Sequence, residues 1–332
     1  MLDSSRELII DDYTTAMLSQ DSVVEDSVVE DSKAVKPPFG YYGSKQRIAK
    51  KIIHNLPPHS AWVEAFCGSA AVTLAKKPAS IEIINDIDGQ IVNVFEQLRK
   101  NPEELIRAVE LTPYARTEFK ESRTATAADC PIERARQFIV STMMTVNGTN
   151  GTDKTGFSVS PSYSRANVEA RVNRWNNLPD RLQEVVRRLK NVRIENLDGR
   201  ELVKMFSNRP ATLMYLDPPY LTDRNHGYLR DAKEEEFHID LLNLCCRSKC
   251  MIMISAYENP LYDSILTKKG WKRSTIITHT RTTDGVRHVK TEVLWKNKYF
   301  VAAHLTGNLP LKLTAKEIKE KKVNPSRGRV LK

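Results

Sequence analysis

The alternation of hydrophobic and polar residues divides the chain into short apolar runs and longer segments with helical spacing. Short apolar runs predict strands, and apolar residues three or four positions apart predict helices with one buried face. The expected strands lie at 61–64, 81–84, 192–195, 211–216 and 250–255, with an edge hairpin formed by 271–280 and 288–295. The expected helices lie at 44–55, 70–76, 89–100, 102–111, 113–123, 132–144, 178–189, 235–246 and 261–267, with another from about 201. This alternation predicts a doubly wound α/β sheet.

The segment from 211 to 220 is the most informative part of the sequence. Its first six residues carry no charge, which is typical of a strand buried on both faces, and the strand is followed by Asp217, Pro218, Pro219 and Tyr220. Proline cannot continue a ladder of hydrogen bonds, so the strand should end there in a stiff turn. The carboxyl edge of an open α/β sheet is where ligands bind. A proline-stiffened turn without a functional role is the alternative interpretation.

Such a turn suits a planar base with an exocyclic amino group. The amino nitrogen is a poor nucleophile because its lone pair is delocalised into the ring. Two acceptors, the Asp217 carboxylate and the Pro218 carbonyl, would draw it toward a tetrahedral form, and Tyr220 would stack on the base. Preorganised acceptors stabilise positive charge that develops only in the transition state. We therefore interpret Asp217, Pro218 and Tyr220 as catalytic residues.

A second group of motifs predicts a cofactor site. The glycine turn Phe66-Cys-Gly68-Ser follows the first strand, and an acid, Asp86, follows the second strand about twenty residues later, as expected for a group that binds a ribose diol. The turn lacks the three-glycine pattern that binds a pyrophosphate. The expected cofactor therefore carries a nucleoside without a diphosphate, as S-adenosylmethionine does. Asp198 ends another strand, beside the same cleft or as a helix N-cap.

Two loops are candidates for ligand contacts. In the aromatic loop 37–45, Tyr41 or Tyr42 and Lys45 would line the cleft, and Ser44 would cap the following helix. The segment 146–161 has three glycines and reads as a projecting hairpin or loop. The basic and aromatic residues after it are suited to phosphate and base contacts. They are Arg165, Arg171, Arg174 and Trp175.

Charge is distributed unevenly along the chain. The whole chain has a formal net charge of +10, but residues 1–32 contain nine acidic side chains against Arg6 alone. We interpret residues 1–35 as a largely disordered acidic leader, and the basic remainder favours a polyanionic partner. The five cysteines show no paired spacing, no apolar run is long enough to span a membrane, and no metal site is expected. A reducing cytoplasm is the expected location.

Five motifs in this order resemble the Dam-like (D12 class) DNA adenine-N6 methyltransferases over roughly residues 36–300. They are Phe39-Gly-Tyr-Tyr-Gly-Ser-Lys45, Glu64-Ala-Phe-Cys-Gly-Ser69, Asn85-Asp-Ile-Asp88, Leu216-Asp-Pro-Pro-Tyr-Leu221 and Thr291-Glu-Val-Leu-Trp295. The resemblance implies a Rossmann-like methyltransferase sheet with an inserted target-recognition domain. With it, we assign residues 36–111 and 178–300 to the catalytic domain and 112–177 to the insertion. The excess of Lys and Arg in the tail separately indicates a basic arm at 301–332.

The same resemblance implies roles for individual residues. Those that match cofactor-binding positions of the family are Tyr41, Lys45, Phe66, Gly68, Asp86, Asp198 and Asp217. Tyr41 stands where the best-known members have Trp, and the recognised DNA sequence does not carry over. The expected activity is transfer of a methyl group from S-adenosylmethionine to the N6 of adenine in double-stranded DNA, by base flipping. A cognate restriction endonuclease is a candidate partner.

Two kinds of alternative stay open. Cytosine-N4, an RNA adenine or a glutamine amide could be the methylated amino group, since each can be held by a similar turn. A DNA-binding regulator with this fold but no chemistry is the alternative from another class. The oligomeric state does not follow from the sequence.

Overall fold

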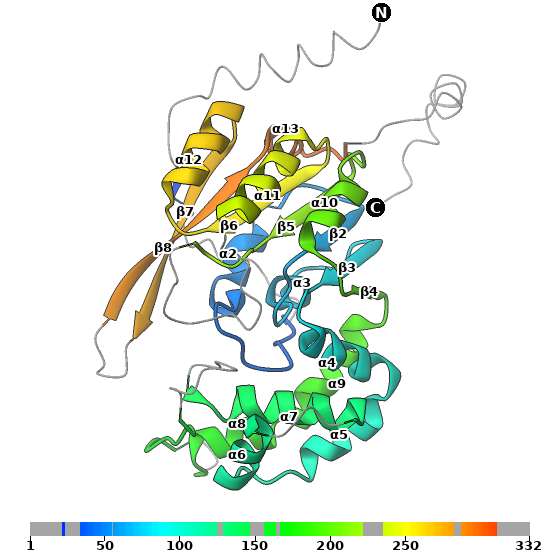
Figure 1. The fold of residues 1–332 in the computed structure, drawn as a ribbon, viewed down its shortest axis with the longest axis vertical. Helices are drawn as coiled ribbons and strands as arrows, with labels where there is room; N and C mark the ends of the chain where they lie inside the picture. Colours follow the sequence, from blue (N-terminus) through cyan, green and yellow to red (C-terminus); the bar gives the residue numbers. More distant parts are fainter. Residues whose placement is uncertain are drawn as a thin grey trace, which may run out of the picture.

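The computed structural model describes residues 22–23, 34–54, 56–124, 129–146, 156–163, 167–221, 235–281 and 287–310. A central sheet has the strand order β1-β7-β8-β6-β5-β2-β3-β4 (Figure 1). The strands are β1 (Ser22–Val23), β2 (Ala61–Glu64), β3 (Ile81–Asn85), β4 (Val192–Glu195), β5 (Thr212–Leu216), β6 (Met251–Ala256), β7 (Lys272–Arg281) and β8 (Arg287–Lys296). Neighbours from β4 to β6 are parallel, whereas β8 runs antiparallel to both β6 and β7. The predicted Rossmann-like α/β fold is confirmed.

The strand order reverses between β2 and β5. From β2 the chain proceeds to β3 and β4 on one side, and then returns to place β5 on the other side of β2. The carboxyl ends of β2, β3, β4 and β5 therefore meet at one edge, around a topological switch point. Ligands bind at such points in open α/β sheets.

Two sets of short helices cover the two faces of the sheet. One face packs on α10 (Gly199–Phe206), α11 (Glu235–Arg247) and α12 (Pro260–Leu266). The opposite face packs on α2 (Ala49–His54), α3 (Ala71–Ala75) and α13 (Lys298–Thr306). Within β5, Met214 and Leu216 face the first set, and Leu213 and Tyr215 face the second. Because β5 is buried on both faces, its sequence is a continuous apolar run.

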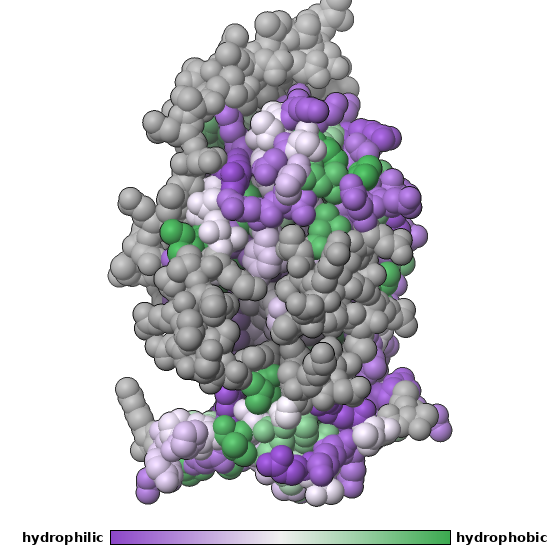
Figure 2. Space-filling view, turned by 60° about the vertical axis from the view of Figure 1, so that its left-hand side comes forward, coloured by the Kyte–Doolittle hydropathy of each residue, from purple (hydrophilic) through white to green (hydrophobic). Residues whose placement is uncertain are grey.

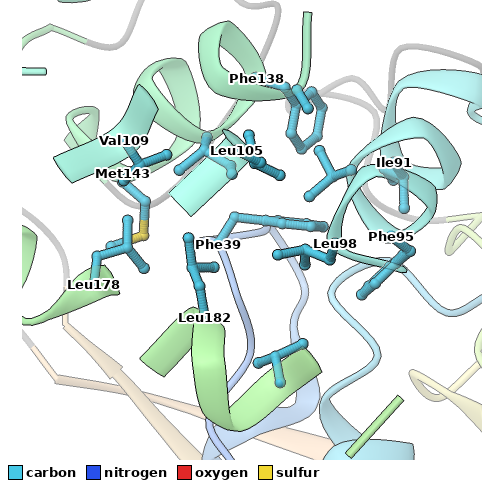
Figure 3. Packing of buried hydrophobic residues seen from close by; sticks show 14 of the residues in the cluster. Phe39, Ile91, Phe95, Leu98, Leu105, Val109, Phe138, Met143, Leu178 and Leu182 are labelled. Atoms are coloured by element: carbon cyan, nitrogen blue, oxygen red, sulfur yellow. The ribbon is translucent and has the colours of Figure 1, made fainter. Parts of the chain in front are cut away.

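The remaining helices form a lobe beside β3 and β4, at the bottom of Figure 1. They are α4 (Gly89–Lys100), α5 (Pro102–Glu110), α6 (Arg116–Thr124), α7 (Pro131–Met143), α8 (Ala170–Asn176) and α9 (Leu178–Leu189). Their apolar faces share one core (Figure 3). Phe39 enters this core from the N-terminal loop and packs edge-on against Phe138, with ring centroids 5.1 Å apart. The loop that follows Phe39 is thereby anchored to the helical lobe.

Several local predictions differ from the structure. The Ser44 side chain caps no helix, because its hydroxyl bonds to that of Ser69 at 2.9 Å and a 3-10 turn, η1 (Lys45–Arg47), follows. Ser22–Val23, within the predicted leader, pairs with β7, so the hairpin does not form the outermost strand there. Residues 301–306, predicted as part of the arm, belong to α13, because Phe300 and Ala303 are buried against the sheet.

The predicted domain boundaries at 111 and 178 stay predictions. Helices α5 and α9, which the prediction places in the catalytic domain, share the core of the helical lobe with α7. Most of the predicted 146–161 hairpin, the 221–233 loop and the end of the basic arm lie outside the described residues. Within the described part, no helix is both long and apolar enough to cross a bilayer. Hydrophilic residues surround smaller hydrophobic areas on the coloured parts of the face in Figure 2.

Candidate active site

A pocket of about 820 Å³, counting the space that opens to solvent, lies at the carboxyl edge of β2, β3 and β5. The predicted site residues that line it are Tyr41, Lys45, Phe66, Gly68, Asp86, Asp198 and Asp217. Pro219 also lines the pocket, whereas Pro218 and Tyr220 do not. Residues from four separate motifs are thus brought to one hollow by the parallel order of the strands.

Two glycines allow aromatic rings to lie close to the pocket wall. Gly68 has a φ of +47°, and a Cβ there would lie 2.8 Å from the Tyr41 ring. At Gly199, the first residue of α10, a Cβ would lie 2.4 Å from the Phe66 ring. Since carbon atoms in contact normally lie about 3.5–4.0 Å apart, neither position admits a side chain unless the ring moves. The glycines therefore fix where the two rings stand.

Asp86 ties the tip of β3 to the glycine turn. Its carboxylate accepts hydrogen bonds from the backbone N–H groups of Gly68, at 2.8 Å, and Asp88, at 3.0 Å. Burial raises the pKa of Asp86 to about 6, although both backbone donors favour the ionised form. The position at the strand tip agrees with the prediction, and contact with a ribose stays a prediction.

Asp198 acts as the N-cap of α10, one of the two roles considered for it. Its side chain accepts the backbone N–H of Arg200 at 2.8 Å and pairs with the Arg200 guanidinium at 2.6 Å. Burial alone would raise the pKa of Asp198, but the hydrogen bonds and charge of Arg200 lower it below its usual value. Asp198 also lines the pocket, so capping does not remove it from the site.

Asp217 follows β5 and forms a buried ion pair with Lys45. The Lys45 ammonium donates to Asp217 Oδ2 at 2.6 Å and lies 3.7 Å from Glu292 Oε1. Burial raises the pKa of Asp217 to about 6; the charge of Lys45 lowers it, and that of Glu292 raises it. For Lys45, burial alone would lower the pKa, but the two acids outweigh it and raise the pKa. The centre therefore holds two carboxyl groups and one ammonium group.

Tyr220 is buried beneath this ion pair. Its hydroxyl lies 2.9 Å from Asp217 Oδ1 and donates a short hydrogen bond to Glu292 Oε1. The Lys45 ammonium stands over its ring, 5.0 Å from the centroid, and Tyr257 packs edge-on at 4.3 Å. The predicted stacking of Tyr220 on a base thus stays a prediction, and Lys45 stands over the ring in this state.

The chain matches the D12 class N6 adenine-specific DNA methyltransferase family over residues 41–284. The chain belongs to this family. The resemblance seen in the sequence is thereby confirmed, and the family supports methyltransferase activity. No match to this D12 methyltransferase was found among curated proteins.

Two solved structures show a distant likeness to the D12 methyltransferase. The SAM-dependent methyltransferase from Agrobacterium tumefaciens is 13% identical with a TM-score of 0.24, over 39% of this chain and 45% of that one. The rRNA methyltransferase aviRa from Streptomyces viridochromogenes is 15% identical with a TM-score of 0.32, over 79% and 89%. The chain thus covers less than half of the first protein. The fold assignment depends on the strand order of this chain.

The sequence interpretation gave no role to two buried acids of the D12 methyltransferase. Glu64 ends β2 and lines the pocket, where its carboxylate accepts the backbone N–H of Thr73 at 2.9 Å. Burial raises the pKa of Glu64 to about 7. Glu292 lies on β8 and accepts hydrogen bonds from Tyr220 and Ser255. The acid at the end of the otherwise apolar strand β2 was a signal that could have identified Glu64, whereas the mixed sequence of β8 gives no local signal for Glu292.

The basic and aromatic stretch of the D12 methyltransferase is only partly available to a ligand. Trp175 is buried and donates its indole N–H to the Thr112 carbonyl at 2.7 Å, so the predicted base contact is wrong for this residue. Arg174 and an unpredicted residue, Arg181, both approach the sulfur of Met143, at 3.7 and 3.8 Å. Burial, together with the charge of Arg174, lowers the pKa of Arg181 to about 10.

Proposed function

We propose that this chain transfers a methyl group from S-adenosylmethionine to the exocyclic N6 of adenine in double-stranded DNA. The observation that carries the proposal is the position of Asp217. The turn after β5 presents this carboxylate to the pocket that also contains the glycine turn and the acid at the tip of β3. Family membership supports adenine as the base and DNA as the substrate.

The residues of the pocket fit the proposed cofactor. Asp86 and Asp88 would hold the ribose hydroxyls, and Phe66 and Ile87 would contact the adenine. Glu64, a buried carboxyl group on the pocket wall, would hold the ammonium of the methionine part. The absence of a Cβ at Gly68 and Gly199 keeps the Tyr41 and Phe66 rings in place around this space. When bound, the cofactor supplies a methyl group activated by a sulfonium.

The chemistry expected of the protein is to orient the amino group and accept a proton. The nitrogen must present its lone pair to the methyl carbon, and one nitrogen-bound proton must leave. Asp217 and the Pro218 carbonyl would accept the two amino hydrogens, which favours the tetrahedral nitrogen. With a pKa raised to about 6 by burial, Asp217 is ionised at neutral pH and can take the proton.

The target base must leave the duplex to reach this pocket. The N6 group of adenine takes part in a base pair inside the stack, so enzymes that modify it extrude the nucleotide. In the flipped state, Tyr220 would stack on the base after Lys45 has moved from its ring. Alignment of nitrogen, methyl and sulfur is the main demand on the site, because the leaving group is already activated.

A pair of arginines in the helical lobe supports a polyanionic substrate. Among the described residues, no carboxylate forms an ion pair with Arg174 or Arg181, and Nε of Arg181 is buried without a hydrogen-bond partner. Two guanidinium groups that share one sulfur contact repel each other and gain from a bound anion. A backbone phosphate of DNA matches the planar donors of arginine.

The test is methyl incorporation from labelled S-adenosylmethionine into duplex DNA, followed by digestion to nucleosides. We expect N6-methyl-2′-deoxyadenosine from the wild type and none from Asp217→Ala, with cofactor binding at least partly retained. Asp263→Asn, on α12 and outside the pocket, is the matched control and should keep full activity. Full activity of Asp217→Ala would refute the assignment.

The same assay separates the alternatives. Label in N4-methyl-2′-deoxycytidine would identify cytosine as the target, and the assay repeated with RNA or with protein as the acceptor would reveal methylation of an RNA adenine or of a glutamine amide. DNA binding without any incorporation would favour a regulator that performs no chemistry. The ion-paired acid at the end of β5 and its position in the pocket favour the enzyme.

A further inference from the structure

Glu292 belongs to a buried hydrogen-bond network that reaches Asp217 through Tyr220. It lies on β8, paired with Ile276 of β7, and only 6% of its side chain is exposed. Its Oε1 accepts the hydroxyl of Ser255, on β6, at 2.6 Å, and the hydroxyl of Tyr220. Tyr220 in turn contacts Asp217 Oδ1 at 2.9 Å. One phenol therefore stands between two carboxyl groups.

The number of protons constrains this arrangement. A tyrosine hydroxyl carries one proton and can donate it to one acceptor at a time. Both contacts are hydrogen bonds together only when one of the two carboxyl groups is protonated. Glu292 Oε1 accepts from both Tyr220 and Ser255. When neither carboxyl group carries a proton, Glu292 and Asp217 compete for the single Tyr220 proton.

The other oxygen of Asp217 is already engaged. Oδ2 accepts from the Lys45 ammonium at 2.6 Å. Oδ1 receives only a share of the Tyr220 proton, because Glu292 Oε1 contacts the same hydroxyl. Oδ1 is consequently the acceptor that the amino group of a substrate can use. Removing Glu292 would return the Tyr220 proton to Asp217 and weaken that acceptor.

We propose that Glu292 is a positioning residue for the methyl transfer: it competes with Asp217 for the Tyr220 hydroxyl proton, which makes Asp217 Oδ1 more available to the amino group. Its negative charge also makes Asp217 a stronger proton acceptor. This inference rests on the proposed function. In the transfer, the nitrogen lone pair forms a bond to the methyl carbon as the carbon–sulfur bond breaks. One proton then passes from the nitrogen to Asp217, so the charge balances.

Other titratable groups act on Asp217 together with Glu292, and the test must separate their effects. They are Lys45 beside its Oδ2, Glu64 at the end of β2, Tyr215 on β5, Tyr220 in the turn, Tyr257 after β6 and Tyr262 on α12. Burial raises the pKa of Asp217, the charge of Glu292 adds to the rise, and the hydrogen bond from Tyr220 lowers it. Variants of Glu292 and Tyr220 should therefore shift this pKa in opposite directions.

The experiment measures the pKa of Asp217 directly, by carbon NMR of its carboxyl group across pH 4–9. Glu292→Gln, which keeps the shape of the side chain but removes the charge, should lower this pKa. Tyr220→Phe, which removes the hydroxyl donor, should raise it. Glu82→Gln is the matched control. It removes a buried acid on β3 that pairs with Lys76, and it should leave the Asp217 titration unchanged.

Activity gives a second measurement. In Glu292→Gln, kcat should fall by roughly tenfold or more, while the KM for S-adenosylmethionine changes little. The acidic limb of the pH profile should move to lower pH, and in Tyr220→Phe to higher pH. A purely structural role would not produce opposite shifts.

Two results would overturn the inference: an unchanged Asp217 titration in Glu292→Gln, or shifts of the same sign in both variants. If Glu292→Gln does not fold, Ser255→Ala takes its place. It removes the other hydroxyl donor to Glu292 Oε1, which should draw the Tyr220 proton further toward Glu292 and raise the Asp217 pKa; an unchanged pKa would overturn the inference. If the wild type methylates no amino group, the proposed function fails, and the NMR titration alone decides whether Glu292 controls Asp217.

Discussion

Replacement of Gly68 by alanine tests whether the glycine turn holds the Tyr41 ring at the pocket. Two costs follow from the geometry. The φ of +47° lies in the left-handed region, which costs a residue with a Cβ about 1–2 kcal/mol. The new Cβ would lie 2.8 and 2.9 Å from two carbons of the Tyr41 ring, so the ring must withdraw by roughly 0.7–1 Å to reach normal contact. Overpacking of this kind adds about 1–3 kcal/mol.

Gly270→Ala provides the matched control. Gly270 also has a positive φ, of +73°, but no atom lies within 4 Å of a Cβ there. The control should lose only the backbone term, about 1–2 kcal/mol. Gly68→Ala should lose at least about 1 kcal/mol more, because only there must a ring move. Urea unfolding of the two variants measures the difference in the free energy of unfolding.

Cofactor affinity provides the second measurement for this prediction. Tyr41 lines the pocket, so its displacement should weaken S-adenosylmethionine binding in Gly68→Ala, whereas Gly270→Ala should bind as the wild type does. Isothermal titration calorimetry gives both dissociation constants. In a Tyr41→Ala background no ring opposes the new Cβ. Adding Gly68→Ala there should therefore lower the free energy of unfolding by the backbone cost alone, about 1–2 kcal/mol. Equal stability losses in the two single variants, with equal affinities, would refute the reasoning.

Three further predictions follow from individual side chains. Burial raises the pKa of Glu64 to about 7, so the folded state holds a proton that the unfolded chain releases from about pH 4.5 upward. The stability that this adds is fully present near pH 4.5 and is lost as pH rises to about 7, and Glu64→Gln should flatten that part of the urea-unfolding profile. Arg174→Gln/Arg181→Gln should weaken duplex binding for all sequences and reduce the slope of log K against log salt by about 0.9 for each phosphate that the variant no longer neutralises. Arg187→Gln, an exposed change on α9, should affect that slope less, and equal slopes would count against the anion site. Trp175→Phe leaves the buried carbonyl that its indole satisfies without a donor, which should cost about 1–3 kcal/mol by thermal unfolding and leave DNA affinity unchanged.

The sequence predicted elements well where local chemistry sets their bounds. The predicted helix 89–100 matches α4, because Asp88 accepts the Gln90 N–H as an N-cap and apolar residues repeat along one face. The predicted 178–189 helix matches α9, which begins with Leu178 and Pro179. Strand β4 also has its predicted bounds.

The network around Asp217 required information that local patterns do not contain. Glu292 reaches Tyr220 and Lys45, the partners of Asp217, because β8 lies between β6 and β7 in the sheet, and hydrophobic periodicity does not specify this order. Lys45 reaches Asp217 across 172 positions of sequence. The prediction that Trp175 contacts a base was wrong because it used local sequence alone. Its basic neighbours suggested a surface, but the core of the helical lobe takes its ring.

The anchoring of Phe39 links the two parts of the molecule mechanically. Phe39 is fixed among the lobe helices, and Lys45, six positions later, is bonded to Asp217. Between them the backbone forms a turn in which the Ser44 N–H donates to the Tyr41 carbonyl at 3.1 Å, so movement of the lobe reaches Lys45 through this turn. Displacement of the lobe against the sheet would pull on the cation that neutralises Asp217. The position of the lobe and the geometry of the Lys45–Asp217 ion pair are thus coupled through this segment.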